Sequence, residues 1–207
     1  MSTARLGIFG GTFDPPHLGH LVVATHARRL LGLDRVLWVV ANDPWQKSID
    51  HPPSPAAVRL AMVRAAVEPF EGQDACGIEI ERGGASYTVD TVRELAVRLA
   101  EADSGTDSAT TADLVVVLGH DAAASLDTWH GADELRGLVR IAVVGRPGFD
   151  DRPIPSGWNI ERVEVPMLEL SSTDLRARFG DGRPLDVIVQ PPVVAVARAH
   201  GLYGDGR

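Results

Sequence analysis

The stretch that decides the fold is Gly10-Gly-Thr-Phe-Asp-Pro-Pro-His-Leu-Gly-His20, because it joins an expected strand to an expected helix. The apolar run Arg5–Phe9 before it is typical of a short strand. Pro15 and Pro16 are tolerated just before or at a helix start, so a helix is expected to begin near Leu18. The two leading glycines permit a tight turn and let a polyanion approach the backbone. The stretch therefore predicts an anion-binding loop between a strand and a helix.

A helix that begins at this point places His17 and His20 three residues apart on one face. Both imidazoles then lie at the positive end of the helix dipole, beside free backbone N–H groups, where they can donate hydrogen bonds to phosphate oxygens. Gly19, between them, leaves room for a ligand. Taken alone, two such histidines could equally be surface residues or a metal pair. The stretch is neither a Walker A loop nor the dinucleotide fingerprint of three spaced glycines.

Short β-branched runs alternate with helical patterns along the rest of the chain, which is typical of crossover units and a parallel sheet. The runs 36–40 and 114–118 are apolar without alternation and are expected at the sheet centre, covered on both faces. We therefore expect one doubly wound, Rossmann-like α/β domain over 1–207, with helices on both faces and a small helical C-terminal part at 171–207. Expected strands are Arg5–Phe9, Arg35–Ala41, Gly77–Glu81, Asp113–Leu118, Arg140–Val144 and Glu161–Val165. Expected helices are Leu18–Leu31, Pro55–Val67, Thr88–Glu101, Ala132–Leu138, Ser172–Phe179 and Pro192–His200.

Ligands of such sheets bind outside the carboxyl ends of the strands, so the loops there should surround the site. These loops follow Phe9, Ala41, Glu81, Leu118 and Val144. Two other segments are expected to be connections: the small polar stretch 102–112, and the irregular surface excursion Gly148–Trp158.

Composition limits the classes of function. The chain has 207 residues, of which 44% are hydrophobic, and a formal net charge of −8, which fits one globular domain. Because no apolar run approaches the roughly 20 residues needed to cross a bilayer, and no signal-peptide pattern is present, a cytoplasmic location is expected. The acidic balance argues against broad binding to nucleic acid or membranes, yet allows an anionic small substrate in one pocket. The single cysteine, Cys76, excludes an intramolecular disulfide and is interpreted as a small buried strand residue.

The ten positions from Gly11 to His20 match the signature Gly-x-Phe-x-Pro-x-His-x-Gly-His completely. The sequence thereby resembles the HxGH nucleotidyltransferase superfamily, whose members bind ATP or CTP with the signature histidines on the triphosphate. A second superfamily element is similar to Leu170-Ser-Ser-Thr-Asp-Leu-Arg176. There Ser172 and Thr173 can cap a helix and bind phosphate, and Arg176 reaches the triphosphate. On its own, Ser-Ser-Thr is a common helix cap.

Within the superfamily, the chain looks most like the bacterial nicotinate-nucleotide adenylyltransferases. Asn42-Asp-Pro-Trp-Gln-Lys47 is similar to their Asn-Pro-x-x-Lys loop, with Lys47 on the acceptor phosphate, although the commoner Pro-Pro pair is absent. Ser86-Tyr-Thr-Val-Asp-Thr91 resembles Ser-Tyr-Thr-x-Asp-Thr, where backbone N–H groups at Thr88 receive the nicotinate carboxylate. Trp45 would then act as a lid, whereas Trp38 is expected in the core.

Two later segments extend the resemblance. The segment from Gly119 to Trp129 resembles the family's Gly-x-Asp…Trp, with Trp129 stacked on the pyridine ring, although a core tryptophan is the alternative. Asp121 would contact a ribose or an Mg²⁺-bound water, or else cap a helix. Arg146 resembles the arginine of the family's Arg-Pro-Gly and would contact phosphate or ribose at the ligand edge of the sheet.

The resemblance implies that ATP, carried with Mg²⁺, donates its adenylyl group to nicotinate mononucleotide by in-line attack without a covalent intermediate. The implied catalytic residues are His17, His20, Lys47 and Arg176. The implied ATP contacts are Phe9, Gly10, Gly11, Thr12, Phe13, Gly19, Gly119, Asp121, Arg146, Ser172 and Thr173. The implied acceptor contacts are Trp45, Lys47, Tyr87, Thr88 and Trp129. A phosphopantetheine adenylyltransferase and a non-catalytic nucleotide-binding regulator are the rival readings, and assembly into a homo-oligomer is left open.

Overall fold

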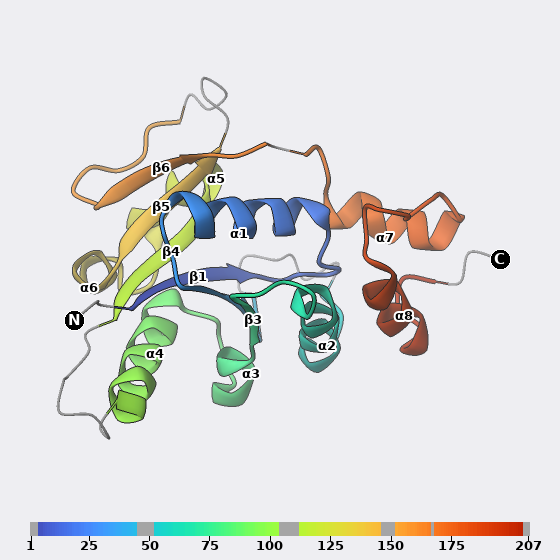
Figure 1. The fold of residues 1–207 in the computed structure, drawn as a ribbon, viewed down its shortest axis with the longest axis horizontal. Coiled ribbons are helices and arrows are strands. Elements are labelled where there is room, and N and C mark those ends of the chain that lie inside the picture. The colour runs from blue at the N-terminus through green and yellow to red at the C-terminus, as the bar shows by residue number, and fades with distance from the viewer. Residues whose placement is uncertain (1–3, 45–51, 104–111, 146–151, 167, 205–207) are drawn as a thin grey trace.

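The computed structural model describes residues 4–44, 52–103, 112–145, 152–166 and 168–204. Within these ranges six parallel strands form one sheet in the order β3-β2-β1-β4-β5-β6 (Figure 1). The strands are β1 (Arg5–Gly11), β2 (Arg35–Val40), β3 (Gln73–Cys76), β4 (Asp113–Gly119), β5 (Arg140–Gly145) and β6 (Ile160–Glu164). The helices of the same ranges are α1 (Leu18–Leu30), α2 (Ala56–Val67), α3 (Ile78–Arg82), α4 (Thr88–Asp103), α5 (His120–Ala123), α6 (Ala132–Leu138), α7 (Ser172–Asp181) and α8 (Pro191–Ala199), with a 3₁₀ turn η1 (Leu126–Thr128).

The predicted doubly wound α/β fold is confirmed. β1 pairs with β2 on one side and with β4 on the other, so the strand order reverses beside β1. Val115 and Val117 of β4 join the apolar cluster under α1 and α2, whereas Val116 joins the cluster under α4 and α6. Figure 1 shows α1 and α4 on opposite sides of the sheet. The interior places of β2 and β4 agree with their continuous apolar sequences.

The third predicted strand is wrong. The strand is Gln73–Cys76, and the expected strand Gly77–Glu81 instead forms the short helix α3, which begins after Gly77. Two isoleucines alternate with two glutamates in that segment, which favours a strand on periodicity alone. In the fold, however, Ile78 and Glu79 are both buried, so the alternation does not separate a buried face from an exposed one. Cys76 lies at the end of β3, as predicted for a strand residue, but it is only partly buried, and this burial raises the pKa of its thiol.

The C-terminal helices form a separate layer at one end of the sheet, seen at the right of Figure 1. α8 packs against α2, and a third apolar cluster joins Met62 of α2 to Leu175 and Phe179 of α7 and Val193 of α8. This layer holds the start of α7 near the carboxyl end of β1.

The described part of the predicted excursion after β5 has no helix or strand, but it is not wholly a surface segment. Trp158 is buried, its indole N–H donates to Asp127 at 2.8 Å, and the Arg136 guanidinium lies 4.9 Å from its ring centroid. An indole of this size gains more from burial than the surrounding polar sequence indicates. The polar stretch 104–111 lies outside the described residues.

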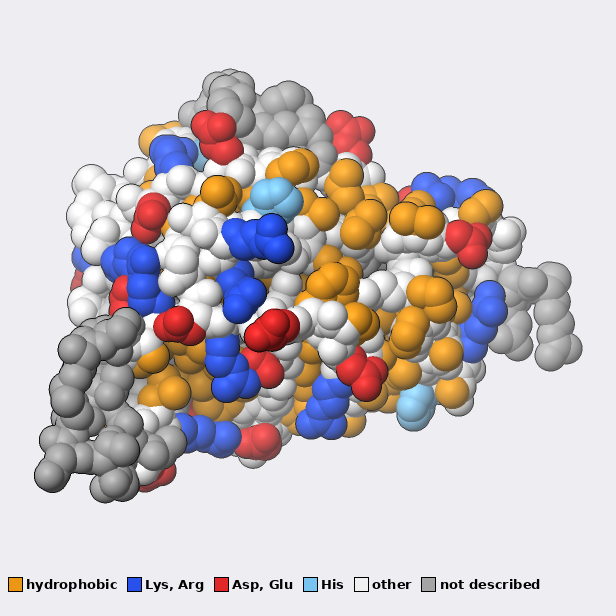
Figure 2. All heavy atoms as spheres, viewed as in Figure 1, with side chains coloured by type: hydrophobic (Ala, Val, Ile, Leu, Met, Phe, Trp, Pro, Cys, Tyr) orange, Lys and Arg blue, Asp and Glu red, His pale blue; other side chains and the backbone are white. Residues whose placement is uncertain are grey.

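Charged side chains of both signs are interspersed on the face drawn in Figure 2. Ion pairs between described residues include Arg35 with Asp74 and Arg140 with Glu161. Exposed pairs of this kind contribute little stability individually. None of the helices in the described ranges is long and apolar enough to cross a membrane.

Candidate active site

The turn after β1 is made by a phenylalanine. Gly10 and Gly11 belong to β1 itself, so the predicted tight turn at these glycines is wrong. Phe13 adopts the left-handed backbone conformation, with φ 51°, and the Asp14–Pro15 peptide bond is cis. The Phe13 ring is buried, and its centroid lies 5.5 Å from that of Phe9 and 5.2 Å from that of Trp38. This packing holds a conformation that non-glycine residues rarely adopt.

The first helix begins at Leu18, as predicted, with His17 as its extended N-cap residue. The rings of His17 and His20 stack with centroids 3.7 Å apart and planes 30° apart. The backbone N–H of His17 donates to His20 Nδ1 at 3.2 Å. A neutral His20 therefore carries its proton on Nε2, the ring nitrogen that can donate a hydrogen bond.

His17 is buried, and its Nδ1 has no hydrogen-bond partner among the described residues. Such an atom at a helix N-terminus suits a ligand that supplies the missing partner. A Cβ on Gly19 would lie 3.1 Å from His17 Nδ1 and Cε1, a tight contact that would require the His17 ring to shift slightly. Burial also lowers the pKa of His17 from 6.5 to about 4, so the imidazole is neutral near pH 7.

This lowered pKa predicts that acid weakens the fold. Below about pH 6.5 the unfolded chain protonates at His17, whereas the folded protein does so only near pH 4. The free energy of unfolding is therefore expected to fall by about 3 kcal/mol as the pH drops through this window. Denaturant titrations of the wild type and His17→Asn at pH 7 and pH 4.5 measure it. Equal losses of stability in both proteins would contradict the assignment.

The start of α7 is held against the same loop. Ser171, not Ser172 or Thr173, is the N-cap: its hydroxyl accepts from the Asp174 N–H at 3.2 Å. Ser172 Oγ donates to the Pro15 carbonyl at 3.1 Å instead. The sequence cannot distinguish adjacent serines as caps, because the choice depends on where α7 meets the loop.

Arg176, one turn into α7, completes this arrangement. Its guanidinium donates to the Asp14 carbonyl at 2.8 Å and to Thr173 Oγ1 at 3.2 Å. The N-termini of α1 and α7 thus adjoin one loop, with two imidazoles, a threonine hydroxyl and a guanidinium beside them. Such a donor set is suited to phosphate oxygens.

A buried arginine that the sequence analysis missed connects the histidine loop to the segments that precede α2 and follow β2. Arg59 of α2 is 1% exposed, and its guanidinium donates to the carbonyls of Ser54 at 2.7 Å, Thr12 at 2.9 Å and Asn42 at 3.2 Å. Burial lowers the pKa of this guanidinium below its ordinary value, and the neighbouring Asp14 carboxylate opposes that shift. The sequence of α2 holds two arginines in an otherwise apolar run, Arg59 and Arg64, and nothing local distinguishes the buried one from the exposed one.

The Asp14 carboxylate connects the loop to the C-terminal region. It accepts from the Ser54 N–H at 3.0 Å and from the Tyr203 hydroxyl. Burial, together with the hydrogen bond to Asp14, raises the pKa of Tyr203 far above its usual value. Tyr203 therefore stays a neutral donor and helps fix the loop.

A cavity of about 220 Å³ opens at the carboxyl ends of β1, β2 and β4. It brings together the predicted residues Gly10, Gly11, Thr12, Tyr87, Thr88 and Trp129. Its wall also contains Glu79, Thr91 and His130, to which the sequence analysis assigned no role. The segment Gly10–Thr12 lines this cavity and leads directly into the histidine loop, so the two regions adjoin.

One wall of the cavity combines a helix start with aromatic rings. Tyr87 stacks on His130, with centroids 4.2 Å apart, and Trp129 donates from its indole to Ser125 Oγ at 3.3 Å. The first helical hydrogen bond of α4 runs from the Thr91 N–H to the Tyr87 carbonyl. The amides of Thr88 and the two residues after it precede that bond, so they can donate to an anion.

Gly131 lets this wall close. It has a φ of +67°, and a Cβ there would lie 2.8 Å from Val89 Cγ1 in the first turn of α4. Gly131→Ala is therefore expected to destabilise the protein by roughly 1–3 kcal/mol and to displace Trp129. Thermal unfolding measures the loss of stability, and the KM for the substrate that binds in this cavity measures the displacement of Trp129. Gly137→Ala, where a Cβ meets no atom within 4 Å, is the control; matching behaviour of the two variants would count against a packing role.

The remaining predicted residues either lie apart from the cavity or lie outside the residues that the structure describes. Gly119 is exposed at the end of β4, and it, not Asp121, is the N-cap of α5. Asp121 is exposed and pairs with Arg152. Trp45, Lys47 and Arg146 lie outside the described residues.

Comparison with known proteins agrees with this geometry. The profile of the cytidylyltransferase-like family matches residues 8–178, which include the histidine loop and the start of α7. The chain belongs to the cytidylyltransferase-like family. A probable nicotinate-nucleotide adenylyltransferase of Exiguobacterium sibiricum is 38% identical over 199 residues, 96% of this chain and 98% of the other. One of Roseiflexus sp. is 40% identical over 210 residues, 98% and 100% of the two chains.

These relatives confirm the predicted resemblance to the nicotinate-nucleotide adenylyltransferases within the cytidylyltransferase-like family. A solved structure of the nicotinic acid mononucleotide adenylyltransferase of Plasmodium falciparum, complexed with NaAD, superposes with a TM-score of 0.71. That structure is 16% identical in sequence, and the match covers 97% of both chains. The shared fold therefore extends over nearly the whole chain.

Proposed function

We propose that the protein transfers the adenylyl group of ATP to nicotinate mononucleotide, which gives nicotinate adenine dinucleotide and pyrophosphate. The observation that carries the proposal is the joint placement of two regions at one sheet edge. The His17–His20 helix start offers donors for a triphosphate, and the adjoining cavity has the helix start at Thr88 and the Trp129 ring. The relatives from Exiguobacterium sibiricum and Roseiflexus sp. bear the name of this activity.

In the proposed reaction a phosphate oxygen of nicotinate mononucleotide attacks the α-phosphorus of ATP in line, and the bond to pyrophosphate breaks. The attacking phosphate is already an anion near neutral pH, so no general base is required. The protein holds two polyanions in line and stabilises the negative charge of the transition state. His20 Nε2, His17 and Arg176 are the proposed donors to ATP, with Thr173 beside them.

The acceptor is proposed to lie in the 220 Å³ cavity. Backbone N–H groups at Thr88 would receive its carboxylate, and Trp129 would stack on its flat pyridine ring. Lys47 and Arg146, both outside the described residues, are proposed to contact the acceptor phosphate and the nucleotide edge. Asp121 pairs with Arg152, so a substrate contact there requires that this exposed ion pair opens.

Mg²⁺ is proposed to enter already bound to the triphosphate. Beside the histidine loop lie imidazoles, a hydroxyl and a guanidinium, which suit phosphate oxygens better than Mg²⁺, a cation that prefers carboxylates and water. The carboxylate of the loop itself, Asp14, already accepts hydrogen bonds from Ser54 and Tyr203. Bound to ATP, the ion neutralises charge on the phosphates. Thr173 and Arg176 would then hold the phosphate oxygens that remain accessible.

Pyrophosphate release tests the function directly. The assay contains ATP and Mg²⁺ with nicotinate mononucleotide, nicotinamide mononucleotide or phosphopantetheine as the acceptor. We expect the fastest turnover with nicotinate mononucleotide. Turnover with phosphopantetheine alone would keep the reaction class but overturn the roles of Thr88 and Trp129, and no turnover with any acceptor would contradict the proposal.

A further inference from the structure

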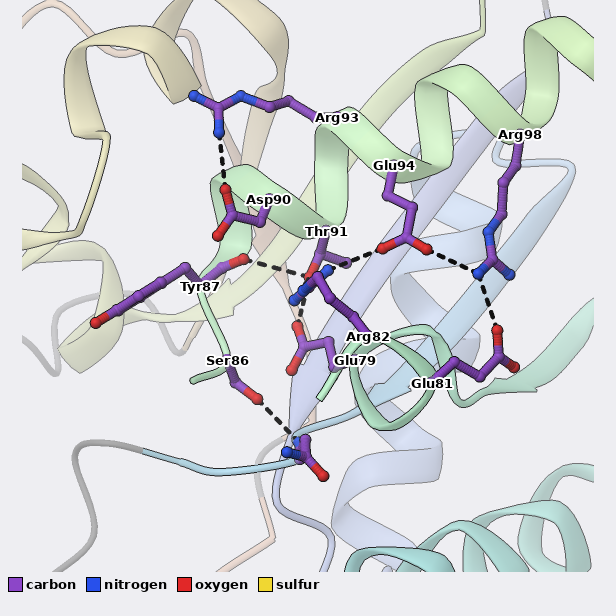
Figure 3. Close-up of polar contacts among 11 residues, drawn as sticks. Glu79, Glu81, Arg82, Ser86, Tyr87, Asp90, Thr91, Arg93, Glu94 and Arg98 are labelled. Atoms are coloured by element: carbon purple, nitrogen blue, oxygen red, sulfur yellow. Dashed lines mark hydrogen bonds and ion pairs between the residues drawn. The ribbon is translucent and has the colours of Figure 1, made fainter. Parts of the chain in front are cut away.

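A buried carboxylate lies in the wall of the cavity without a role in the proposed chemistry. Glu79 belongs to α3 and is 7% exposed. Its Oε1 accepts a short hydrogen bond of 2.6 Å from the hydroxyl of Thr91, which also lines the cavity (Figure 3). Burial of a carboxylate costs free energy, so a neutral side chain at this position would favour stability. We therefore infer that the carboxylate is present because it orients its partner.

Thr91 links this carboxylate to the start of α4. The single proton of its hydroxyl goes to the nearer, charged acceptor, Glu79, while the Arg82 guanidinium donates to the same oxygen at 3.1 Å. The backbone N–H of Thr91 donates to the Tyr87 carbonyl at 3.2 Å, and its hydroxyl lies 3.3 Å from that carbonyl. The orientation of Thr91 thus fixes where the first turn of α4 begins.

The residues that this turn carries face the cavity. Tyr87 and Thr88 lie in its wall, and Figure 3 shows Tyr87 at the start of α4 with its ring turned away from Glu79 and Arg82. The outer part of the network consists of Glu94, Arg98 and Glu81, and only its inner end reaches the cavity wall.

We propose that Glu79 is a positioning residue for the acceptor: acting through Thr91, it holds the Tyr87–Thr88 segment where the nicotinate group binds. The inference rests on the proposed function and deepens it. The hydrogen bonds of the Thr91 hydroxyl run to Glu79, Arg82 and Tyr87, which lie outside the histidine loop, so we expect the pair to act on affinity for the acceptor and not on that for ATP. A hydrogen bond to a buried charge is strong enough to change acceptor affinity about tenfold.

Steady-state kinetics with each substrate varied separately tests this. Thr91→Val keeps the shape but removes the hydroxyl, and is expected to raise the KM for nicotinate mononucleotide about tenfold while kcat and the KM for ATP stay within about twofold. Thr91→Ser restores the hydroxyl and should stay close to the wild type. Glu81→Gln, in the outer network, is the control and should leave both KM values unchanged.

A double variant separates positioning from stability. Glu79→Leu with Thr91→Val removes both buried polar partners, so it is expected to regain stability relative to Thr91→Val alone. Its acceptor KM should nevertheless stay high, because the orienting contact is missing. A double variant with wild-type acceptor KM, or a parallel rise in the KM for ATP, overturns the inference. A wild-type enzyme that does not use nicotinate mononucleotide overturns the proposed function, and the inference with it.

Discussion

Replacing His20 with alanine is expected to lower the rate of pyrophosphate release about a hundred- to a thousandfold. His20 Nδ1 accepts from the His17 N–H, so the donor of a neutral ring is Nε2, which we assign to the phosphate where charge develops. The loss of one preorganised donor to a transition-state oxyanion typically costs roughly 2.7–4 kcal/mol. The measurement is kcat with saturating ATP and nicotinate mononucleotide.

The same helix offers a matched control for this variant. His26 lies two turns further along α1, where its Nδ1 contacts the Val22 carbonyl at 2.9 Å, and it does not line the cavity. His26→Ala should therefore retain nearly full kcat. Thermal unfolding of both variants tests whether the fold is intact. A His20→Ala enzyme that is folded and within threefold of wild-type kcat would remove His20 from the proposed catalytic group.

The parts of the site that follow from local chain geometry could be predicted from the sequence. The position of the first helix follows from the prolines, and the meeting of His17, its N-cap residue, with His20 follows from their spacing of three residues at the helix start. The loop after Phe9, with Gly10, was expected at the site from the rule that ligands bind at the carboxyl ends of parallel strands, whereas Thr88 and Trp129 were placed there by the family resemblance; the structure gathers all three in one cavity.

The parts that depend on tertiary partners could not be predicted. β3 is an edge strand of polar sequence, stabilised by contacts such as the hydrogen bond from Trp38 Nε1 to Gln73 Oε1, which no periodicity reveals. Glu79 reads as an exposed residue of an alternating strand until Thr91 is placed beside it. Likewise, Arg59 resembles a solvated arginine until three carbonyls from distant loops surround it.

Arg59→Met is expected to give the largest loss of stability, about 3–5 kcal/mol. Methionine fills much of the same volume but leaves the carbonyls of Thr12, Asn42 and Ser54 without their buried donor. It also leaves the Asp14 carboxylate without a neighbouring buried cation, and removal of one member of a buried charge pair is strongly destabilising. Denaturant unfolding at pH 7 measures the loss.

Arg64→Met, on the exposed face of the same helix, is the control and should change the free energy of unfolding by less than about 0.5 kcal/mol. If the two variants have equal stability, the guanidinium does not join the loops as the structure indicates.

Enzyme kinetics distinguishes Arg59 from Thr91 in a second way. Thr12 precedes the histidine loop and Asn42 follows β2, so Arg59→Met should raise the KM for both substrates, whereas the loss of the Thr91 hydroxyl should raise only that of the acceptor. A change at the start of α4 would then weaken the binding of the acceptor alone, whereas a change at Arg59 would weaken the binding of both substrates.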